Sequence, residues 1–383
     1  MPERIAIVGI GATQFRTISP DVSYKELMFE AATKAYRDAG IDPRKDVGTF
    51  ITCAEDYIEG VSIFDEYVPD QLGAILRPMQ TITGDGLHGI AVAKMLLLTG
   101  QFDIAVVEAH VKASNMRTPA GIAAFAQDPV FTRPLGLNTL FVAGLEMNRY
   151  CQETGVTLEQ CGRVAVKNRG NALENALAAR AAELTLADHA GSRPVAAPLA
   201  ELDIAEPADG AIVVVLATES RARSLNREPI WLTGIGWCNG SSDLEARDWA
   251  MPEYVARAGE MACAMSGISN PRTGFDFAEI DDTYTYKELQ HLAALRICPA
   301  ETVGEWTAGG ATEADGEFPV NVSGGALGMG HLHEAMGLAR LYCAVEQLRG
   351  EAGSAQLPEI ERCLIQSWRG IPTASAAAAV LEV

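Results

Sequence analysis

One glycine-rich turn in the sequence has the form of a place that holds a reacting group. The segment TITGDGLHGI (81–90) contains a Gly-Asp-Gly turn, and the periodic apolar residues that follow predict a helix over residues 86–99. The first N–H groups of a helix are unpaired and lie at the positive end of its dipole, so such a turn can stabilise an anion or activate a nucleophile. Thr83 stands at the start of the turn, and Asp85 lies beside Gly86.

A second glycine-rich turn carries two histidines. The segment NVSGGALGMGHLHEAMG (321–337) holds Asn321, His331 and His333, and a helix is expected over residues 333–349. The same argument about helix N-termini applies here. The sequence therefore offers two places where polar side chains meet the start of a helix.

The elements that position these turns come in two similar sets. IAIVGIG (5–11) resembles IWLTGIG (230–236), and AYRDAGIDPRKDVGTFITC (35–53) resembles AMSGISNPRTGFDFAEIDD (264–282). The two matches occur at nearly the same separation along the chain, which indicates a duplication. In each set an apolar strand ends in Gly-Ile-Gly, a helix follows and stops at a glycine, and a loop with proline leads to a second strand.

This alternation predicts the fold class and the domain organisation. Strands that alternate with helices indicate an α/β layered architecture with mostly parallel sheets covered by helices. We place the two halves at residues 1–225 and 226–383. Residues 114–200 lack the alternation, and we interpret them as an inserted loop domain over one face, with a helical run over residues 158–182.

The composition excludes several classes of function. The chain has 383 residues with 50 Asp and Glu against 30 Lys and Arg, and its formal charge of −20 repels nucleic acid and anionic membranes. The apolar run at residues 90–98 is broken by Lys94 and is too short to span a bilayer, and no signal-peptide pattern is present. We therefore expect a cytoplasmic protein.

The eight cysteines give little support for a metal site or a disulfide framework. None forms a Cys-x-x-Cys pair or a Cys/His cluster with zinc spacing. We expect most of them to be buried free thiols, and we expect no metal and no bound cofactor.

The segment with the histidines is similar to the motif Asn-x-x-Gly-Gly-x-x-x-x-Gly-His-Pro of the thiolase superfamily. Asn321, Gly324, Gly325, Gly330 and His331 match it, and a leucine replaces the proline. With the duplicated halves, the TGDG turn and the stretch EIDDTYTYKEL, nearly the whole chain resembles the sterol-carrier type of thiolase. The resemblance implies a duplicated α/β/α/β/α layered fold with an inserted loop domain.

The reactive residues of thiolases are mostly absent. Thiolases carry a nucleophilic cysteine in a Cys-x-x-Gly turn, where this chain has Thr83 and Gly86. Sterol-carrier-type members have His-Asp-Cys-Phe where this chain has Asp-Asp-Thr-Tyr at residues 281–284. The loop that holds the second thiolase cysteine is here Ser367 to Gly370. An alcohol is far less ionised than a thiol, so Thr83 is a poor substitute for the nucleophile.

Three functions are compatible with these departures. We favour an acyl-CoA lyase of the aldol type, which cleaves a β-hydroxyacyl-CoA through an enolate and needs no covalent acyl-enzyme. The superfamily contains steroid side-chain aldolases that lack the cysteines. The second alternative is a non-catalytic thiolase-like subunit that works with a cysteine-bearing or zinc-ribbon partner. The third is acyl transfer or thiolysis of a β-ketoacyl-CoA with a displaced nucleophile, Cys53 or Cys363.

The resemblance gives roles to four candidate catalytic residues. His331 would stabilise the enolate, and Asn321 would orient a water or a donor in the same hole. Tyr284, like Tyr286 beside it, could move a proton or be buried in the core or an interface. Asp282 would be a general base or an anchor for the loop.

Several candidates also have purely structural interpretations. His331 could be a capping or core histidine, and Asn321 a turn asparagine. His333 could be a second acid or base, although a solvated histidine on the first helical turn is the simpler interpretation. Asp85 could reach into the site or cap the helix.

The resemblance also implies ligands and partners. A coenzyme A thioester is the expected substrate, and a homodimer through the TITGD strand and a small partner with an OB-fold and a zinc ribbon are the expected assemblies. Lys112, Arg117 and Arg369 are candidates for phosphate contacts or plain surface cations. The apolar residues of the insertion suit a bulky acyl group or pack the loop domain: Phe125, Val130, Phe131 and Phe141.

Overall fold

Nine strands form one sheet in the computed structural model, which describes residues 3–55, 63–116, 118–225, 227–241, 243–370 and 374–383. Their order is β3-β2-β4-β7-β1-β8-β11-β10-β9. The strands are β1 (Ile5–Ala12), β2 (Thr49–Cys53), β3 (Met79–Ile82), β4 (Ile104–Lys112), β7 (Asp209–Thr218), β8 (Ile230–Asn239), β9 (Phe277–Glu279), β10 (Arg362–Arg369) and β11 (Ser375–Glu382).

The sheet consists of two leaves that meet at a narrow junction. β1 and β8 pair at only two positions, Ala6 with Trp231 and Ile7 with Ile230. Outward from this junction, the N-terminal leaf runs β1-β7-β4-β2 and the C-terminal leaf runs β8-β11-β10-β9, and the pairings are antiparallel, antiparallel and parallel in both. The two leaves thus repeat one topology, as the duplicated sequence predicts.

The expectation of mostly parallel sheets is wrong. β1 with β7, β7 with β4, β8 with β11, and β11 with β10 are all antiparallel, and only the outer pairs are parallel. β10 and β11 are consecutive strands joined by a short connection, which gives an antiparallel pair, whereas parallel neighbours need a longer crossover. The alternation of strands and helices along the sequence therefore did not show whether neighbouring strands run parallel or antiparallel.

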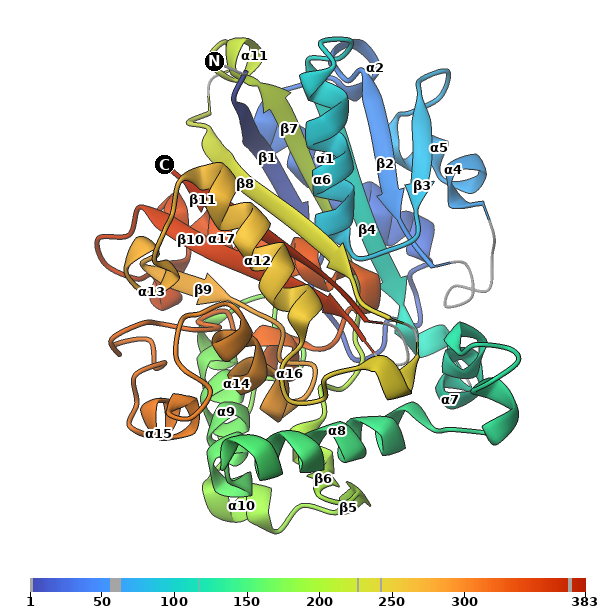
Figure 1. Ribbon diagram of the computed structural model, residues 1–383. Coiled ribbons are helices and arrows are strands. Elements are labelled where there is room, and N and C mark those ends of the chain that lie inside the picture. Colours follow the sequence, from blue (N-terminus) through green and yellow to red (C-terminus); the bar gives the residue numbers. More distant parts are fainter. Residues whose placement is uncertain (1–2, 56–62, 117, 226, 242, 371–373) are drawn as a thin grey trace.

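The helices form three layers around the two leaves (Figure 1). α6 (Gly86–Leu98) and α17 (Met336–Leu348) contact each other and lie between the leaves, and each packs against strands of both. α1 (Tyr24–Ala39) covers the outer side of the N-terminal leaf, and α12 (Glu253–Ser266) covers that of the C-terminal leaf. This is the expected α/β/α/β/α arrangement.

The sequence explains where these helices begin and end. Ser23 and Glu26 form a capping box at the start of α1, and left-handed Gly40 ends it. Left-handed Gly267 ends α12 in the same way, so both predicted glycine stops are confirmed. α6 is apolar on nearly all sides, because it is buried between two leaves rather than lying on a surface.

The insertion lies beyond one end of the strands (Figure 1). Its α9 (Leu158–Asn171) packs against α14 (Thr285–Ala294), α15 (Val303–Ala308) and α16 (Gly325–Met329) rather than over a face of the sheet, so the predicted position is wrong. The predicted helix over residues 158–182 is also too long, because α9 ends at Asn171 and the chain then runs beside the second glycine-rich turn. The regular elements are α7 (Pro119–Ala123), α8 (Thr139–Thr154), α9 (Leu158–Asn171), α10 (Leu186–Ala190), β5 (Pro194–Ala196) and β6 (Leu199–Ala200).

Short helices complete the connections. The division expected at residues 225 and 226 falls between α11 (Glu219–Ala222) and β8, where the chain passes from one leaf to the other. No helix among the described residues has the length and apolar character that crossing a bilayer requires. The short helices are α2 (Pro43–Asp46), α4 (Phe64–Tyr67), α5 (Pro69–Leu72), α11 (Glu219–Ala222), α13 (Pro271–Gly274), α14 (Thr285–Ala294), α15 (Val303–Ala308) and α16 (Gly325–Met329), with 3-10 turns η1 (Ala113–Asn115), η2 (Ala124–Ala126), η3 (Arg133–Leu135), η4 (Ala172–Glu174), η5 (Glu201–Asp203), η6 (Leu244–Ala246), η7 (His333–Ala335) and η8 (Gly353–Ala355).

Candidate active site

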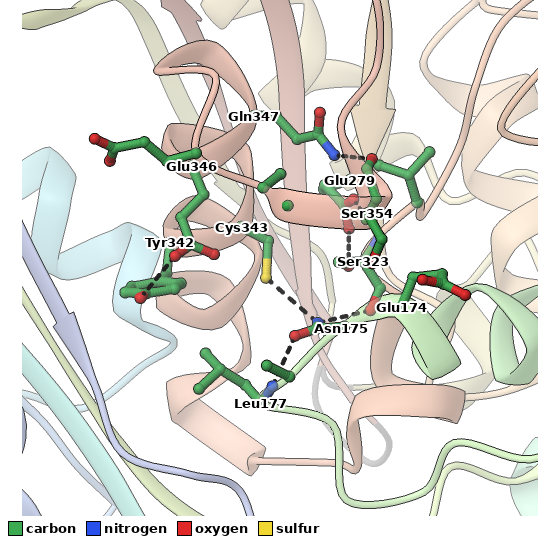
Figure 2. Close-up of a pocket in the computed structure, with 16 residues that line it drawn as sticks. Glu174, Asn175, Leu177, Glu279, Ser323, Tyr342, Cys343, Glu346, Gln347 and Ser354 are labelled. Carbon is green, nitrogen blue, oxygen red and sulfur yellow. Dashed lines mark hydrogen bonds between the residues drawn. The ribbon is translucent and has the colours of Figure 1, made fainter.

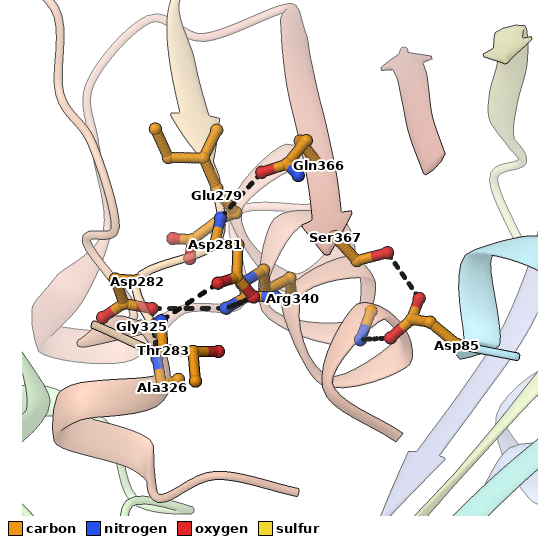
Figure 3. A network of polar contacts seen from close by, with 12 residues as sticks. Asp85, Glu279, Asp281, Asp282, Thr283, Gly325, Ala326, Arg340, Gln366 and Ser367 are labelled. Atoms are coloured by element: carbon orange, nitrogen blue, oxygen red, sulfur yellow. Dashed lines mark hydrogen bonds and ion pairs between the residues drawn. The ribbon is translucent and has the colours of Figure 1, made fainter. Parts of the chain in front are cut away.

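Four segments that are distant in sequence converge at the N-termini of the two middle helices (Figure 3). They are the start of α6, the loop between β9 and α14, the second glycine-rich turn and the end of β10. Hydrogen bonds tie them together: Ser367 on β10 bonds Asp85, and the Asp281 N–H donates to Gln366 on β10. The two turns selected from the sequence therefore belong to one site.

Asp85 caps α6 and also bonds two other segments. Its Oδ1 accepts hydrogen bonds from Leu87 N at 2.9 Å and Ser367 Oγ at 2.5 Å, and its Oδ2 accepts one from Gly337 N at 2.8 Å. Burial is the main cause of the raised pKa of Asp85, and these hydrogen bonds act in the opposite direction. Of the two interpretations of Asp85, the structure agrees with the cap.

Asp282 is anchored by four donors. Its carboxylate accepts hydrogen bonds from Ala326 N at 2.6 Å, Leu327 N at 3.1 Å, Asn168 Nδ2 at 2.8 Å and Arg340 Nη2 at 3.2 Å. A carboxylate has about four acceptor positions, so none is left for a substrate proton. Burial, opposed by the charge of Arg340, raises the pKa of Asp282 to about 6. Asp282 is therefore placed as a loop anchor rather than as the general base.

Arg340 is the cation that compensates the paired aspartates. It lies on α17, is fully buried, and forms ion pairs with Asp281 at 3.0 Å and Asp282 at 3.2 Å (Figure 3). Two buried carboxylates without a cation would be very costly. Sequence reasoning missed Arg340, although the pair Asp281-Asp282 after a buried strand and the single cation of α17 were signals.

Asn321 uses its side chain to build the turn. Its Oδ1 accepts a hydrogen bond from Ile280 N at 2.8 Å, and its Nδ2 donates to Glu288 Oε2 at 2.8 Å. Its backbone is left-handed with φ of 53°, a conformation in which Asn is enriched. The structure places Asn321 as a turn asparagine.

His331 and His333 lie ring against ring beside this network. Their ring centroids are 4.7 Å apart with an interplanar angle of 72°, and both residues are half-buried. Removal from water, helped by the charge of Arg340, lowers the pKa of His331 to about 4. Removal from water, helped by His331, lowers the pKa of His333 to about 3. Both imidazoles are thus neutral at pH 7.

His333 differs from its expected position. The interpretation as a solvated histidine on the first helical turn is wrong, because its Nε2 is buried with no hydrogen-bond partner among the described residues. Its backbone is left-handed with φ of 45°, and such strain in a non-glycine residue is concentrated at functional sites. His333 is the first residue of the turn η7, which leads into α17.

The two tyrosines of the β9–α14 loop are buried in an aromatic cluster. Tyr284 and Tyr286 stack at 5.9 Å, and Tyr284 meets Trp368 edge-on at 6.2 Å. The Tyr286 hydroxyl donates to Glu146 on α8 at 3.0 Å and so connects the insertion to α14. Burial is the main cause of a raised pKa in both tyrosines, so neither hydroxyl ionises easily.

Comparison with known proteins identifies the family. Residues 238–383 match the family described as thiolase C-terminal domain-like. A steroid side-chain-cleaving aldolase of Thermomonospora curvata is 30% identical over 390 residues, which cover 97% of each chain. The chain belongs to the thiolase superfamily.

Two further similarities concern the same branch of the superfamily. The 17-hydroxy-3-oxo-4-pregnene-20-carboxyl-CoA lyase of Mycobacterium tuberculosis is 28% identical, with 96% of this chain and 97% of that protein covered. The solved structure of the Ltp2-ChsH2(DUF35) aldolase superposes with a TM-score of 0.85 at 28% identity, and covers 99% of this chain and 98% of that chain. The similarity extends over the whole fold.

The thiolase nucleophile position holds no activated group. Thr83 is exposed, and its carbonyl accepts a hydrogen bond from Arg369 at 3.4 Å, while no hydrogen bond in the described part of the chain links its hydroxyl to a base. Cys53 and Cys363 are fully buried, and burial is the main cause of their raised thiol pKa. Neither cysteine can act as the displaced nucleophile of the third hypothesis in this conformation.

The loop glycines of the superfamily motif permit close contacts. A Cβ at Gly86 would lie 2.3 Å from Leu338 of α17, and one at Gly325 would lie 2.2 Å from Asp282. Gly324 and Gly330 have φ of 99° and 98°, which side-chain-bearing residues rarely adopt. Gly370 packs more loosely, since a Cβ there would lie 3.2 Å from the Trp368 ring.

The predicted phosphate contacts are only partly placed. Lys112 is buried and paired with Asp209 at 2.8 Å, so it is neither a surface cation nor free for a phosphate. Arg369 forms an ion pair with Glu55, and Arg117 lies outside the described residues. Of the two interpretations of the apolar side chains in the insertion, packing of the loop domain is wrong, since these are exposed: Phe125, Val130, Phe131 and Phe141.

A cavity of about 360 Å³ lies behind the second glycine-rich turn (Figure 2). It shares Ser323 and Glu279 with the site, where Ser323 Oγ donates to Glu279 at 2.5 Å. Glu346 and Cys343 of α17 also line it. Within the described residues, no group of three or more His, Cys, Asp or Glu side chains is arranged to hold a metal ion.

Proposed function

We propose that this chain cleaves the Cα–Cβ bond of a β-hydroxyacyl-CoA by a retro-aldol reaction, without a covalent acyl-enzyme. One observation carries the proposal: the histidine loop of the thiolase superfamily is retained around neutral His331, while the nucleophile turn holds an exposed threonine, Thr83. The named activities of the related aldolase and lyase agree with it.

The proposed reaction needs a base and an oxyanion donor. A base takes the proton of the β-hydroxyl, the Cα–Cβ bond breaks, and its electrons form a thioester enolate. We assign His331 as the donor to the enolate oxygen, since a neutral imidazole can donate one hydrogen bond. We assign His333 as the base from its place beside His331: its imidazole is unprotonated at pH 7, although its lowered pKa makes it a weak base, and its Nε2 has no partner among the described residues. The α-carbon of the enolate then takes a proton, and the other fragment leaves as a carbonyl compound.

The assembly is part of the same proposal. β3 is the outermost strand of the N-terminal leaf and is half-buried along its length, and Ile75 and Leu76 beside it are exposed. An open edge of this kind suits a homodimer. The name of the Ltp2-ChsH2(DUF35) aldolase supports a second, small subunit, for which we propose the OB-fold and zinc-ribbon type. We place the protein in the cytoplasm.

Mass spectrometry of substrate panels tests the proposal. The purified chain, with any protein that co-purifies, is given β-hydroxyacyl-CoA and β-ketoacyl-CoA compounds with and without free CoA. We expect a β-hydroxyacyl-CoA to yield a carbonyl compound and a shorter acyl-CoA without added CoA. Because one oxyanion donor contributes about 10²- to 10³-fold to kcat, His331→Ala should lose about that factor.

The matched variant at the same position is His331→Gln. Its amide can still donate a hydrogen bond, so it should retain more activity than His331→Ala. Cleavage that requires CoA and a β-ketoacyl-CoA would contradict the proposal and indicate a thiolase reaction. Inactivity of the purified complex with both panels would instead support a non-catalytic subunit.

A further inference from the structure

We infer that Asp85 is a positioning residue whose single carboxylate joins the N-termini of both middle helices and thereby fixes the loop that carries His331 and His333. The inference rests on the proposed function for its kinetic consequence, but its structural part stands on geometry alone. Asp85 is 2% exposed and touches no open surface, so it acts through other residues rather than on a substrate.

The carboxylate supplies a cap that α17 lacks. Asp85 is the N-cap of α6, to which it belongs in sequence, and accepts from Leu87 N. The N-cap of α17 is Ala335, which has no side chain to cap a helix, and Asp85 Oδ2 accepts from Gly337 N in its place. The free N–H groups of two helices thus share one anion, which both helix dipoles stabilise.

The contact between Asp85 and the start of α17 requires glycine at two neighbouring positions. A Cβ at Gly337 would lie 2.0 Å from Asp85 Oδ1, and a Cβ at Gly86 would lie 2.3 Å from Leu338. Ser367 Oγ bonds the same Oδ1, so the end of β10 is tied to the junction as well (Figure 3). Three of the four segments of the site are therefore held by one side chain.

The junction acts on the histidines through a short and stiff connection. His333 to Ala335 form η7, which leads directly into α17, and Leu332 and Ala335 are fully buried. A shift of the α17 N-terminus must therefore move His333, whose left-handed backbone has little freedom. A misplacement of about 1 Å can cost about 10²-fold in rate.

The test compares Asp85→Ala and Asp85→Asn with Ser23→Ala. Ser23→Ala removes the cap of α1, an outer helix distant in the layers from the site, and controls for the loss of a helix cap. We expect kcat to fall about 10²-fold in Asp85→Ala and less in Asp85→Asn, which keeps one acceptor, with KM little changed. Ser23→Ala should keep the kcat of the unchanged protein.

A second measurement separates this inference from the proposed function. In protein labelled with ¹⁵N-histidine, the imidazole signals of His331 and His333 should shift in both Asp85 variants and stay in place in Ser23→Ala. Unmoved signals in folded Asp85→Asn would overturn the inference even if the enzyme is active. Shifted signals in a chain that cleaves no β-hydroxyacyl-CoA would uphold the junction and reject the function. Loss of the acid limb of the pH profile in Asp85→Asn would assign Asp85 a proton-transfer role and reject a positioning one.

Discussion

Burial keeps both histidines of the candidate site neutral at the pH where enzymes usually work. A neutral imidazole keeps one N–H group that can donate a hydrogen bond to a developing oxyanion, which suits an enolate donor. The cause differs slightly between the two: after burial, His331 responds to the buried cation Arg340, and His333 responds to His331. Arg340 therefore compensates the charges of Asp281 and Asp282 and also helps to lower the pKa of His331.

The protonation state of these histidines can be measured without a substrate. With pKa values lowered to about 4 for His331 and about 3 for His333, their ¹⁵N signals should remain those of neutral imidazoles at pH 5. In the chain unfolded by guanidinium, the same histidines should titrate near the ordinary value of about 6.5. The unfolded chain then binds more protons, so these groups reduce stability as pH falls from about 6.5 to about 4 for His331 and to about 3 for His333. Titration of the folded-state signals near pH 6.5 would contradict the burial argument.

At the residue scale, sequence reasoning succeeded where a local rule decides the outcome. A carboxylate before a helix predicts a cap, and Asp85 is one. The contacts of Asp282 with Arg340 cross 58 positions of sequence, and no local pattern specifies such a pair. The side chain of Asn321 likewise finds Glu288 on a different element. Hydrogen-bond and ion-pair partners that only the fold brings together could not be predicted from the sequence.

At the element scale, the contact between α6 and α17 depends on glycines. Gly86 and Gly337 allow the two N-termini to approach, because each would place a Cβ within 2.3 Å of an atom of the other helix or its cap. The pattern of apolar residues after each glycine-rich turn predicted the existence of both helices. Their contact could not be predicted, because nothing along the chain shows which faces of two apolar helices meet.

Two glycine-to-alanine substitutions test this dependence. Gly337→Ala should reduce the free energy of unfolding by about 1 to 3 kcal/mol, because the new methyl group meets Asp85 and the helix must shift. Gly170→Ala, in α9, has open space around its Cβ and a helical backbone, so it should increase that free energy by about 0.5 to 1 kcal/mol. Denaturant unfolding measures both. If both substitutions changed the free energy of unfolding equally, α6 and α17 would have space for a methyl group at their contact, and the predicted dependence on glycine would be wrong.

At the scale of the whole molecule, buried carboxyl groups make stability depend on pH. Glu279 is fully buried behind the second glycine-rich turn, and burial, opposed by hydrogen bonds from Ser323, raises its pKa to about 7 from an ordinary 4.5. A carboxyl with a raised pKa binds its proton more tightly in the folded chain. Its contribution therefore favours folding at low pH and is lost as pH rises from about 4.5 to about 7.

Glu279→Gln should remove this dependence. The amide can still accept from Ser323 N and donate to Ser323 Oγ, so we expect the variant to gain stability relative to the unchanged protein between pH 5 and pH 8, on the order of 3 kcal/mol. Denaturant unfolding at several pH values measures the change. Glu305→Gln, which removes an exposed carboxyl, is the control and should follow the unchanged protein. If the free energy of unfolding of Glu279→Gln changed with pH in the same way as that of the unchanged protein, the raised pKa of Glu279 would be contradicted.

The pairing of β1 has a consequence for the order in which the chain can fold. Its main partner is β7, with Ile5 opposite Thr218, so this strand leaves the ribosome long before its neighbour and finds it only after the whole insertion has been made. At about 5 to 20 residues per second, this delay lasts roughly 10 to 40 s. During that time the apolar strand IAIVGIGA has an unsatisfied edge, and the nascent chain must be protected from aggregation until β7 emerges.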